Sequence, residues 1–353
     1  MFSKVLLRKK LAHGFVPSQK TAAAFSTSSS KPWGESKILV TGCQGQVGIP
    51  LVQNLVDELG AENVLATDAS EQKVDLPCSF AKLDVVDADN FMKLAKDNNI
   101  NYVVHLGAII SALGERNPDL AVDVNVTGTI NAVRVAQETQ SKLFVPSSIA
   151  AFGGDLFPKD GTPVETILQP KTIYGVSKVF NEMLGEYYKR KLGMDFRCIR
   201  YPVVVSSEKF AFNRSGCYTT EIFFHALENR HYKCWLAEDT RVPMIYIDDC
   251  VKATVQYLKA DPARLQSHVY NLAGISASAG EFCAAVQQLI PELVVEFEPD
   301  FRQPIAASWP NSLDDKESKR DWDWSYDIST YELASRVLAG IDDKYKTSLK
   351  QQQ

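Results

Sequence analysis

The stretch ILVTGCQGQVG, residues 38–48, constrains the fold of this chain more than any other part of the sequence. Strand-forming and apolar residues lead directly into glycines at positions 42, 45 and 48. Residues 49–60 then carry apolar side chains at a spacing typical of a helix, and Gly60 follows as a stop signal. A backbone this bare, between a strand and a helix, allows a ligand to approach the main chain closely.

A pyrophosphate is the ligand that such a turn suits, because free amide hydrogens and the positive end of the helix dipole point toward it. Asp68 ends the next predicted strand, 26 residues after Gly42. A carboxylate at this place binds the adenosine ribose and repels a 2′-phosphate, and the next basic residue is Lys73. We therefore predict NAD rather than NADP as the cofactor. The predicted contacts are Gly42, Gly45, Gln46, Val47, Gly48 and Asp68.

Strand-like and helical segments alternate through the first part of the chain. We expect strands over 36–40, 63–68, 81–85, 102–108, 142–148 and 196–205, and helices over 49–60, 87–99, about 119–139 and 174–192. This alternation predicts an α/β fold with a Rossmann-type, doubly wound parallel sheet. Asp84 and Val85, at the end of the third strand, are expected beside the adenine, although a surface turn is the alternative for this pair.

The sequence suggests four parts. Residues 1–35 form a leader, 36–205 an NAD-binding Rossmann domain, 206–340 a smaller C-terminal α/β substrate-binding lobe, and 341–353 a flexible tail. Within the lobe, a strand and helix near 244–260 are expected to pack back on the Rossmann domain. We see no internal repeat.

The leader differs in charge from the rest of the chain. Residues 1–34 hold six Lys or Arg and no Asp or Glu, which leaves 32 basic and 43 acidic residues for the remainder. A basic, hydroxyl-rich leader is typical of a mitochondrial transit peptide, and a disordered basic tail is the alternative. We expect a protein of the mitochondrial matrix. The acidic body argues against nucleic-acid binding, and no apolar run approaches the roughly 20 residues of a membrane span.

The seven cysteines are scattered, and neither C-x-x-C nor H-E-x-x-H occurs. We therefore expect reduced thiols and no metal site.

Tyr174 and Lys178 lie four residues apart in YGVSK, which places them on one face of the predicted helix. Free tyrosine has a pKa of about 10, and a neighbouring ammonium stabilises its phenolate. Ser148, at the end of a strand in PSSIAAFG, can hold a substrate oxygen beside that phenol. Ser147 is the competing serine, and we prefer Ser148.

Together the motifs TGCQGQVG, HLGA, NVTGT, PSSIAAFG and YGVSK resemble the extended short-chain dehydrogenase/reductase (NAD-dependent epimerase/dehydratase) family. Within it, HLGAIISALGE, DTRVPMIYIDDCVKAT and RQPIAASWPNSLDD resemble the L-threonine 3-dehydrogenases of mitochondria. The resemblance covers roughly residues 36–335. It implies that NAD oxidises L-threonine at its secondary alcohol, that the partner is a small amino-acid substrate, and that the protein is a homodimer through the helices at about 119–139 and 174–192.

The resemblance also implies roles for individual residues. Tyr174 would be the base, Lys178 would tune it and bind the nicotinamide ribose, and Ser148 would bond the reacting oxygen. Further cofactor contacts would come from Leu106, Gly107, Ala108, Asn125 and Val204, and further substrate contacts from Ser111 and Tyr218.

Two stretches differ from the pattern of the threonine dehydrogenases. Val203 follows Tyr201-Pro202 where that group usually has glycine, and residues 212–218 replace a Gly-Thr-Thr-Asp-Tyr segment. Arg214 in this segment is either a fork for a carboxylate or a solvated loop residue. Two other hypotheses stay open: a nucleotide-sugar epimerase or dehydratase, with arginines 214, 230, 241 and 302 for phosphates, and a non-catalytic NAD-binding homologue.

Overall fold

The computed structural model describes residues 32–72, 74–208 and 217–341. Its centre is a parallel sheet with the strand order β11-β7-β5-β4-β1-β2-β3, to which the short β6 adds beside β7. Its strands are β1 (Ile38–Thr41), β2 (Val64–Asp68), β3 (Ser79–Lys82), β4 (Tyr102–His105), β5 (Lys142–Phe144), β6 (Ser147–Ser148), β7 (Phe196–Tyr201) and β11 (Val269–Asn271). The expected doubly wound sheet is confirmed.

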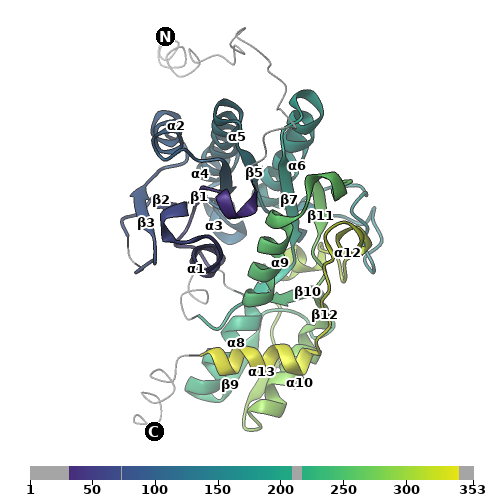
Figure 1. Cartoon of the computed structure of the whole chain (residues 1–353). Coiled ribbons are helices and arrows are strands. Elements are labelled where there is room, and N and C mark those ends of the chain that lie inside the picture. The colour runs from purple at the N-terminus through teal and green to yellow at the C-terminus, as the bar shows by residue number, and fades with distance from the viewer. Residues whose placement is uncertain (1–31, 73, 209–216, 342–353) are drawn as a thin grey trace, which may run out of the picture.

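Helices cover both faces of this sheet, as Figure 1 shows. They are α1 (Gly48–Leu59), α2 (Ala88–Asp97), α3 (Ser111–Arg116), α4 (Pro118–Val122), α5 (Gly128–Thr139), α6 (Ile173–Leu192) and α9 (Ile247–Lys259). The apolar strand residues alternate between the two faces: Val40 packs in a core with α1 and α9, whereas its neighbour Leu39 packs in a core with α2 and α5. A sheet buried on both faces explains why its strands are almost continuously apolar.

The predicted helix at about 119–139 is interrupted by an unexpected turn. α4 and α5 are joined by a π-helical turn, Asp123–Thr127, which contains the buried Asn125. One extra residue per turn shifts the side chains that follow, and turns of this kind are frequent at functional sites. Asp87 caps α2, at the start of the helix predicted over 87–99, and accepts a hydrogen bond from the backbone of Asn90.

The predicted strand 196–205 is divided at Pro202. β7 stays in the central sheet, whereas β8 (Val203–Val205) pairs in parallel with β10 (Arg241–Tyr246) in a second, three-stranded sheet. Proline has no amide hydrogen for a ladder, so the strand changes partners there. Val203 therefore begins the connection to the C-terminal lobe.

The C-terminal lobe has its own core beneath the central sheet in Figure 1. It consists of β9 (His231–Cys234), β12 (Ile275–Ser278), β13 (Val294–Phe297), α8 (Tyr218–Asn229), α10 (Ala279–Leu289), α11 (Gln303–Ala307) and α13 (Thr330–Gly340), with β8 and β10. α12 (Lys316–Trp322) comes from the same half of the chain, but its Trp322 packs in the core of the central sheet that contains α1 and α9. Short 3₁₀ helices lie at Trp33–Glu35, Ala61–Asn63, Ile149–Ala151 and Pro262–Arg264. β11 comes from this half of the chain and still joins the central sheet.

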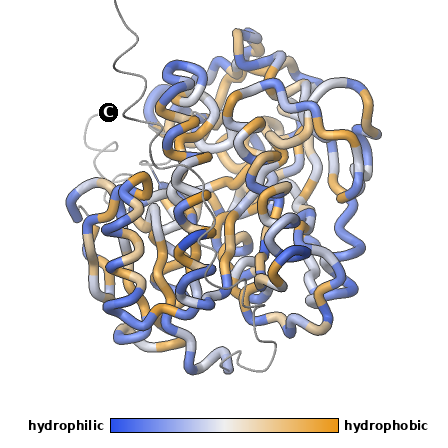
Figure 2. The backbone as a smooth tube through the Cα atoms, turned by 90° about the horizontal axis from the view of Figure 1, so that it is seen from above, coloured by the Kyte–Doolittle hydropathy of each residue, from blue (hydrophilic) through white to orange (hydrophobic). Residues whose placement is uncertain are grey.

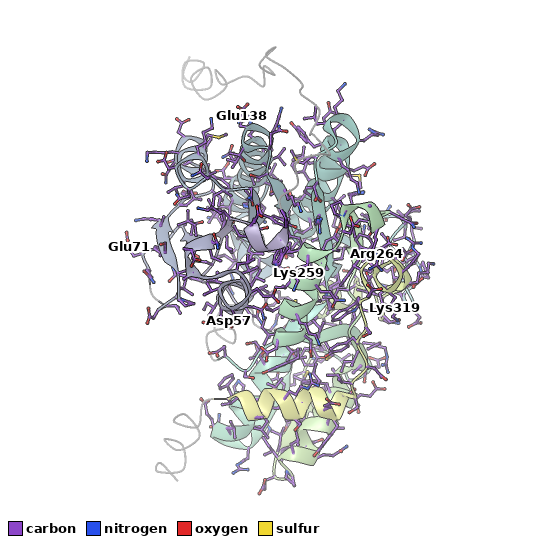
Figure 3. All side chains as sticks on the ribbon, in the orientation of Figure 1. Asp57, Glu71, Glu138, Lys259, Arg264 and Lys319 are labelled. Carbon is purple, nitrogen blue, oxygen red and sulfur yellow. The ribbon has the colours of Figure 1, made fainter. Side chains whose placement is uncertain are left out.

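The helix after β10 connects the two halves. α9 packs on the core that contains Leu51 and Val52 of α1, and Lys259 at its end forms an ion pair with Glu58 at 2.8 Å. Figure 3 shows Lys259 and Asp57 near this junction of the two helices, and other labelled charged side chains at the periphery. Figure 2 shows the complementary pattern, with hydrophobic segments toward the interior and hydrophilic ones outside.

The N-terminal end of the described chain is docked on the Rossmann domain. Trp33, within the segment predicted as the leader, packs edge-on against Tyr102 and donates a hydrogen bond to Glu58. Residues 1–31 of the predicted leader and 342–353 of the predicted tail lie outside the described residues. In the part that is described, every helix is too short or too polar to cross a lipid bilayer.

Candidate active site

The site lies at the carboxyl ends of the parallel strands. β1 lies between β2 and β4 in the sheet. After β1 the chain continues to β2 and β3 in one direction along the sheet, and after β4 it continues to β5 in the other direction. In an open α/β sheet, such a switch point is where the crevice for a ligand forms. The glycine-rich turn follows β1, residues 106–108 follow β4, and Ser148 ends β6. Topology thus brings three predicted site segments to one edge of the sheet.

The glycines allow close packing of the turn. Gly42 has a φ of +66°, and a Cβ there would lie 2.8 Å from the amide nitrogen of Gly107. A Cβ on Gly48 would lie 2.7 Å from the carbonyl carbon of Cys43. Val47, at the N-cap of α1, provides no side-chain hydrogen bond to the first turn of the helix. Amide hydrogens without a capping side chain and three glycines in one turn together fit a pyrophosphate.

Asp68 lies beside this turn in a fixed orientation. Its carboxylate accepts hydrogen bonds from the backbone of Gln44 at 3.2 Å and from the backbone and hydroxyl of Ser70 at 3.1 and 3.0 Å. The half-buried carboxylate is therefore held at the end of β2, where an adenosine ribose would meet it. Asp68 fits the role that the sequence predicts for it.

The predicted adenine residues differ in exposure. Asp84 is exposed, and its carboxylate accepts from the amide of Val86 at 3.0 Å. Val85 is 7% exposed and packs close to Gly107 and Gly128, whose added Cβ atoms would both meet it. The side chain of Val85 thus packs against the backbone that follows β4. Contact of this pair with adenine stays a prediction.

The chain after β4 is held by two buried polar residues that the sequence analysis did not select, Thr41 and His105. The hydroxyl of Thr41 accepts from the amide of Gly107 at 3.1 Å and lies 2.9 Å from Nδ1 of His105. Burial, together with the charge of Lys178, lowers the pKa of His105 to about 3, so its ring is neutral at physiological pH. The position of His105 in the HLGA stretch, directly before the predicted cofactor residues, was the signal available in the sequence.

Asn125 fixes the same segment from the other side. Its side chain accepts from the amide of Ile109 at 2.7 Å, and donates to the carbonyl of Ile109 at 2.9 Å and to the hydroxyl of Ser177 at 3.1 Å. With 1% exposure, Asn125 ties the chain after β4 to α6. Its predicted contact with NAD stays a prediction, and so do those of Leu106, Gly107 and Ala108, which are half-buried.

Tyr174 and Lys178 lie one turn apart on α6, as predicted. The hydroxyl of Thr172 caps this helix by accepting from the amide of Gly175. Lys178 is 4% exposed, its ammonium lies 5.2 Å from the centre of the Tyr174 ring, and it donates a hydrogen bond to the carbonyl of Pro146 at 2.7 Å. The buried ammonium thus lies over the ring of a half-buried tyrosine.

The two candidate serines have different environments. Ser147 is 2% exposed and its hydroxyl donates to the carboxylate of Glu182. Ser148 is half-buried, and its oxygen accepts from the amide of Ala150 at 3.2 Å. A Cβ on Gly175 would lie 3.1 Å from the carbonyl carbon of Ala150, so the start of α6 packs directly against this turn. The environment favours Ser148 as the serine that can meet a substrate.

The remaining predicted residues are Val204, Ser111 and Tyr218. Val204 on β8 accepts a hydrogen bond from the side chain of Gln46. Ser111 begins α3 and is half-buried. Tyr218, predicted to contact substrate, is 2% exposed, and its ring packs edge-on against Trp235 at 5.9 Å in the core of the C-terminal lobe. The structure brings Tyr218 into this core, where burial raises the pKa of its hydroxyl well above the usual value.

The arginines considered for a phosphate-binding role are already paired, as far as the structure describes them. The pairs are Arg230 with Glu292, Arg241 with Glu281 and Arg302 with Asp300. Arg214 and the predicted differences at 212–216 lie outside the described residues. In the described ranges, no group of three or more His, Cys, Asp or Glu side chains is arranged to hold a metal ion.

Comparison with known proteins identifies the family of this chain. Residues 38–273 match the NAD dependent epimerase/dehydratase family. The mitochondrial L-threonine 3-dehydrogenase of Bos taurus is 39% identical over 319 residues, which cover 90% of this chain and 85% of the bovine protein. An uncharacterized epimerase/dehydratase of Staphylococcus aureus is 38% identical over 315 residues, covering 87% of this chain and 97% of that protein.

Solved structures agree with these relatives. The L-threonine dehydrogenase from Phytophthora infestans superimposes with a TM-score of 0.83 at 38% identity. The match covers 88% of this chain and 100% of the Phytophthora chain. A monomeric L-threonine 3-dehydrogenase from a metagenome gives 0.81 at 37% identity, over 86% and 97%. A UDP-glucose 4-epimerase from Thermotoga maritima, at 19% identity and a TM-score of 0.77, shares the fold.

These matches confirm three expectations from the sequence: the Rossmann-type fold, NAD as the cofactor and an NAD-dependent oxidoreductase. They cover the glycine-rich turn, the YGVSK helix and most of the C-terminal lobe. The chain belongs to the NAD-dependent epimerase/dehydratase family, as a member similar to the L-threonine 3-dehydrogenases.

Proposed function

We propose that this protein oxidises L-threonine at its secondary alcohol, giving 2-amino-3-oxobutanoate and NADH. The observation that carries the proposal is the buried ammonium of Lys178 over the Tyr174 ring on α6, with the turn after Ser148 packed against the start of this helix. The identity to L-threonine 3-dehydrogenases over most of the chain supports the choice of substrate. Bound NAD supplies the hydride acceptor.

Tyr174 is the base in this proposal. Its phenolate takes the hydroxyl proton of the substrate, and the buried ammonium of Lys178 stabilises that phenolate. Because His105 is neutral at physiological pH, it adds no second positive charge beside Lys178. The same ammonium, anchored on Pro146, is proposed to bind the nicotinamide ribose with its remaining hydrogens.

Ser148 positions the reacting oxygen. Its hydroxyl oxygen already accepts from Ala150, which leaves the hydroxyl hydrogen to donate to the substrate oxygen as that oxygen becomes a carbonyl. Ser111, at the start of α3, and Tyr218 stay proposed substrate contacts. Tyr218 requires a movement out of the core for that role, because it is 2% exposed.

The pairing of three arginines weighs against the epimerase hypothesis. A nucleotide diphosphate needs cations that are free to turn toward it. Arg230, Arg241 and Arg302 each contact an acidic side chain of their own lobe. The presence of Ser148 and of Lys178 beside Tyr174 weighs against a non-catalytic homologue.

One assay tests the proposal. NADH formation is measured with L-threonine for the wild-type chain, for Tyr174→Phe and for Tyr188→Phe, a half-buried tyrosine on the same helix as control. We expect kcat to fall roughly 10²- to 10⁴-fold in Tyr174→Phe, with unchanged NAD affinity, and to stay unchanged in the control. Full activity of Tyr174→Phe would exclude this tyrosine as the base.

Other outcomes point to the other hypotheses. Tight NAD binding without turnover by the wild-type chain favours a non-catalytic homologue. Conversion of a nucleotide sugar without net NADH release favours an epimerase.

We also propose that the protein acts in the mitochondrial matrix. The basic leader supports this location, and the relatives from Bos taurus and Sus scrofa are named mitochondrial. A fluorescent fusion of residues 1–36 tests this location, and fluorescence that stays in the cytosol would contradict it.

A homodimer is proposed from the exposed apolar side chains of two neighbouring helices. Val176, Met183 and Tyr187 on α6 are 49%, 53% and 47% exposed, and Leu120 and Val122 on α4 are 40% and 41% exposed. α4 and α6 contact each other, so these side chains lie on adjacent helices that a second copy can cover.

A further inference from the structure

A buried ion pair lies one turn beyond the proposed catalytic lysine on α6. Glu182 follows Lys178 by four residues, so the two side chains share one face of the helix. Glu182 is 0% exposed, and its two carboxylate oxygens accept from Arg200 at 2.9 and 2.7 Å. Arg200, on β7, is 3% exposed and also donates to the carbonyl of Val164 at 2.6 Å. Each carboxylate oxygen of Glu182 and each side-chain nitrogen of Arg200 therefore has a hydrogen-bond partner within the core.

This ion pair holds the strand that carries the proposed catalytic serine. The hydroxyl of Ser147 donates to the same Glu182 oxygen that accepts from Arg200. Ser147 and Arg200 are also direct partners in the register between β6 and β7. Two side chains from neighbouring strands therefore converge on one carboxylate of α6.

The two neighbours of Ser147 in the chain are Pro146 and Ser148, and their environments differ. Before it, Pro146 accepts from the ammonium of Lys178. After it, Ser148 points to the opposite face of the strand, because side chains alternate along a strand, and it is half-buried where Ser147 is buried. The segment 146–148 is thus fastened to α6 at two consecutive residues, which fixes the place of the third.

We propose that Glu182 is a positioning residue for the reaction: together with Arg200 it holds Ser147, and thereby sets the position of the Ser148 hydroxyl relative to Tyr174. This inference rests on the proposed function. It assigns Glu182 no contact with substrate or cofactor. Its physical basis is that a proton transfer and a hydride transfer in one step depend on the placement of the reacting oxygen, so a displacement of about 1 Å costs up to roughly 100-fold in rate.

Ser147→Ala is the variant that tests this role. It removes a neutral hydroxyl and leaves the ion pair between Glu182 and Arg200 intact. Ser141→Ala is the matched control, because Ser141 is also a buried serine whose hydroxyl donates to a protein oxygen, the carbonyl of Ile100, and it also bonds the hydroxyl of Thr139. We expect kcat for L-threonine to fall roughly 10- to 100-fold in Ser147→Ala, with the NAD dissociation constant unchanged and no such fall in Ser141→Ala.

A double-mutant cycle separates positioning from a general loss of stability. If Ser147 acts through Ser148, the Ser147→Ala change costs nothing further in a Ser148→Ala background. An equal fall in both backgrounds would overturn the inference, as would wild-type kcat in Ser147→Ala. Should Ser147→Ala fail to fold, Ser147→Cys replaces it, with an intermediate kcat expected because a thiol is a weak donor. Wild-type kcat in that variant would again overturn the inference.

The outcomes for the proposed function and for this inference are distinguishable. An inactive wild-type chain overturns both. An active wild-type chain whose Ser147→Ala variant is equally active overturns the role of Glu182 alone.

Discussion

Gln46, in the glycine-rich turn, donates a hydrogen bond from its side-chain amide to the carbonyl oxygen of Val204, 3.0 Å away and 158 positions later in the sequence. This contact joins the predicted pyrophosphate site on the Rossmann domain to β8, the strand that leads into the C-terminal lobe. The two ends of the predicted dinucleotide site are therefore connected before a cofactor is considered.

Replacing this amide should weaken cofactor binding. In Gln46→Leu the side chain keeps a similar size and loses the hydrogen bond, at a cost of about 0.5–1.5 kcal/mol. We expect the dissociation constant of NAD to rise roughly two- to tenfold, measured by titration of the protein fluorescence. Gln53→Leu, an exposed glutamine of α1 that bonds Asp57, is the control and should leave NAD binding unchanged. An unaltered constant in Gln46→Leu would show that the contact is dispensable.

Asp68 should determine the choice between NAD and NADP. In Asp68→Asn the charge that accepts from ribose hydroxyls and repels a 2′-phosphate is lost. Hydrogen bonds to charged groups contribute about 1.5–3 kcal/mol, so we expect the KM for NAD to rise at least about tenfold while the KM for NADP falls. Steady-state kinetics with both cofactors measure this ratio. Asp57→Asn, on the outer side of α1, should leave it as it was.

His105 should make the protein less stable in acid. Its pKa is about 3 in the folded chain and 6.5 in a free histidine, because burial disfavours the charged ring. As pH falls from about 6.5 toward 3, the unfolded chain binds a proton that the folded chain does not. The free energy of unfolding therefore decreases in this window, by up to about 1.4 kcal/mol per pH unit.

The measurement is urea unfolding of the wild-type chain and of His105→Gln at several pH values from about 7 to about 4, which cover most of the range in which the unfolded chain binds the extra proton. Glutamine does not titrate, so the variant should lose less stability per pH unit than the wild type. Parallel curves for the two proteins would contradict the assignment of a depressed pKa to His105.

The proposed dimer should depend on the exposed apolar side chains of α6. Met183→Glu places a charge among Val176 and Tyr187, and burying that charge in an interface is unfavourable. We expect light scattering to give a dimeric mass for the wild-type chain and a monomeric mass for this variant. Leu156→Glu, at a residue 59% exposed outside the two helices, should remain dimeric. A monomeric wild-type chain, like the relative from the metagenome, would remove the proposal.

Local patterns predicted much of this site. Glycines at 42, 45 and 48, the acid at 68 and the spacing of Tyr174 and Lys178 each depend on neighbours within one turn or one strand–helix unit. Their geometry follows from backbone hydrogen bonding and side-chain periodicity, so the expected Rossmann fold and NAD cofactor could be confirmed.

Other features depended on contacts between distant segments. Pro202 was visible in the sequence, but only the pairing with β10 decided that Val203 leaves the central sheet. The π-helical turn around Asn125 has no signature in the apolar spacing, and the burial of Tyr218 follows from the packing of Trp235 and Phe282 against its ring.

The sequence by itself determined the class of fold, the identity of the cofactor and the spacing of the tyrosine–lysine pair, because these follow from short-range periodicity and backbone geometry. The tertiary structure decided which of two adjacent serines faces a buried acid and which is left for a substrate. Ser147 and Ser148 are chemically identical and adjacent, and only the carboxylate of Glu182, 35 residues after Ser147 and held by Arg200 from a third segment, distinguishes them.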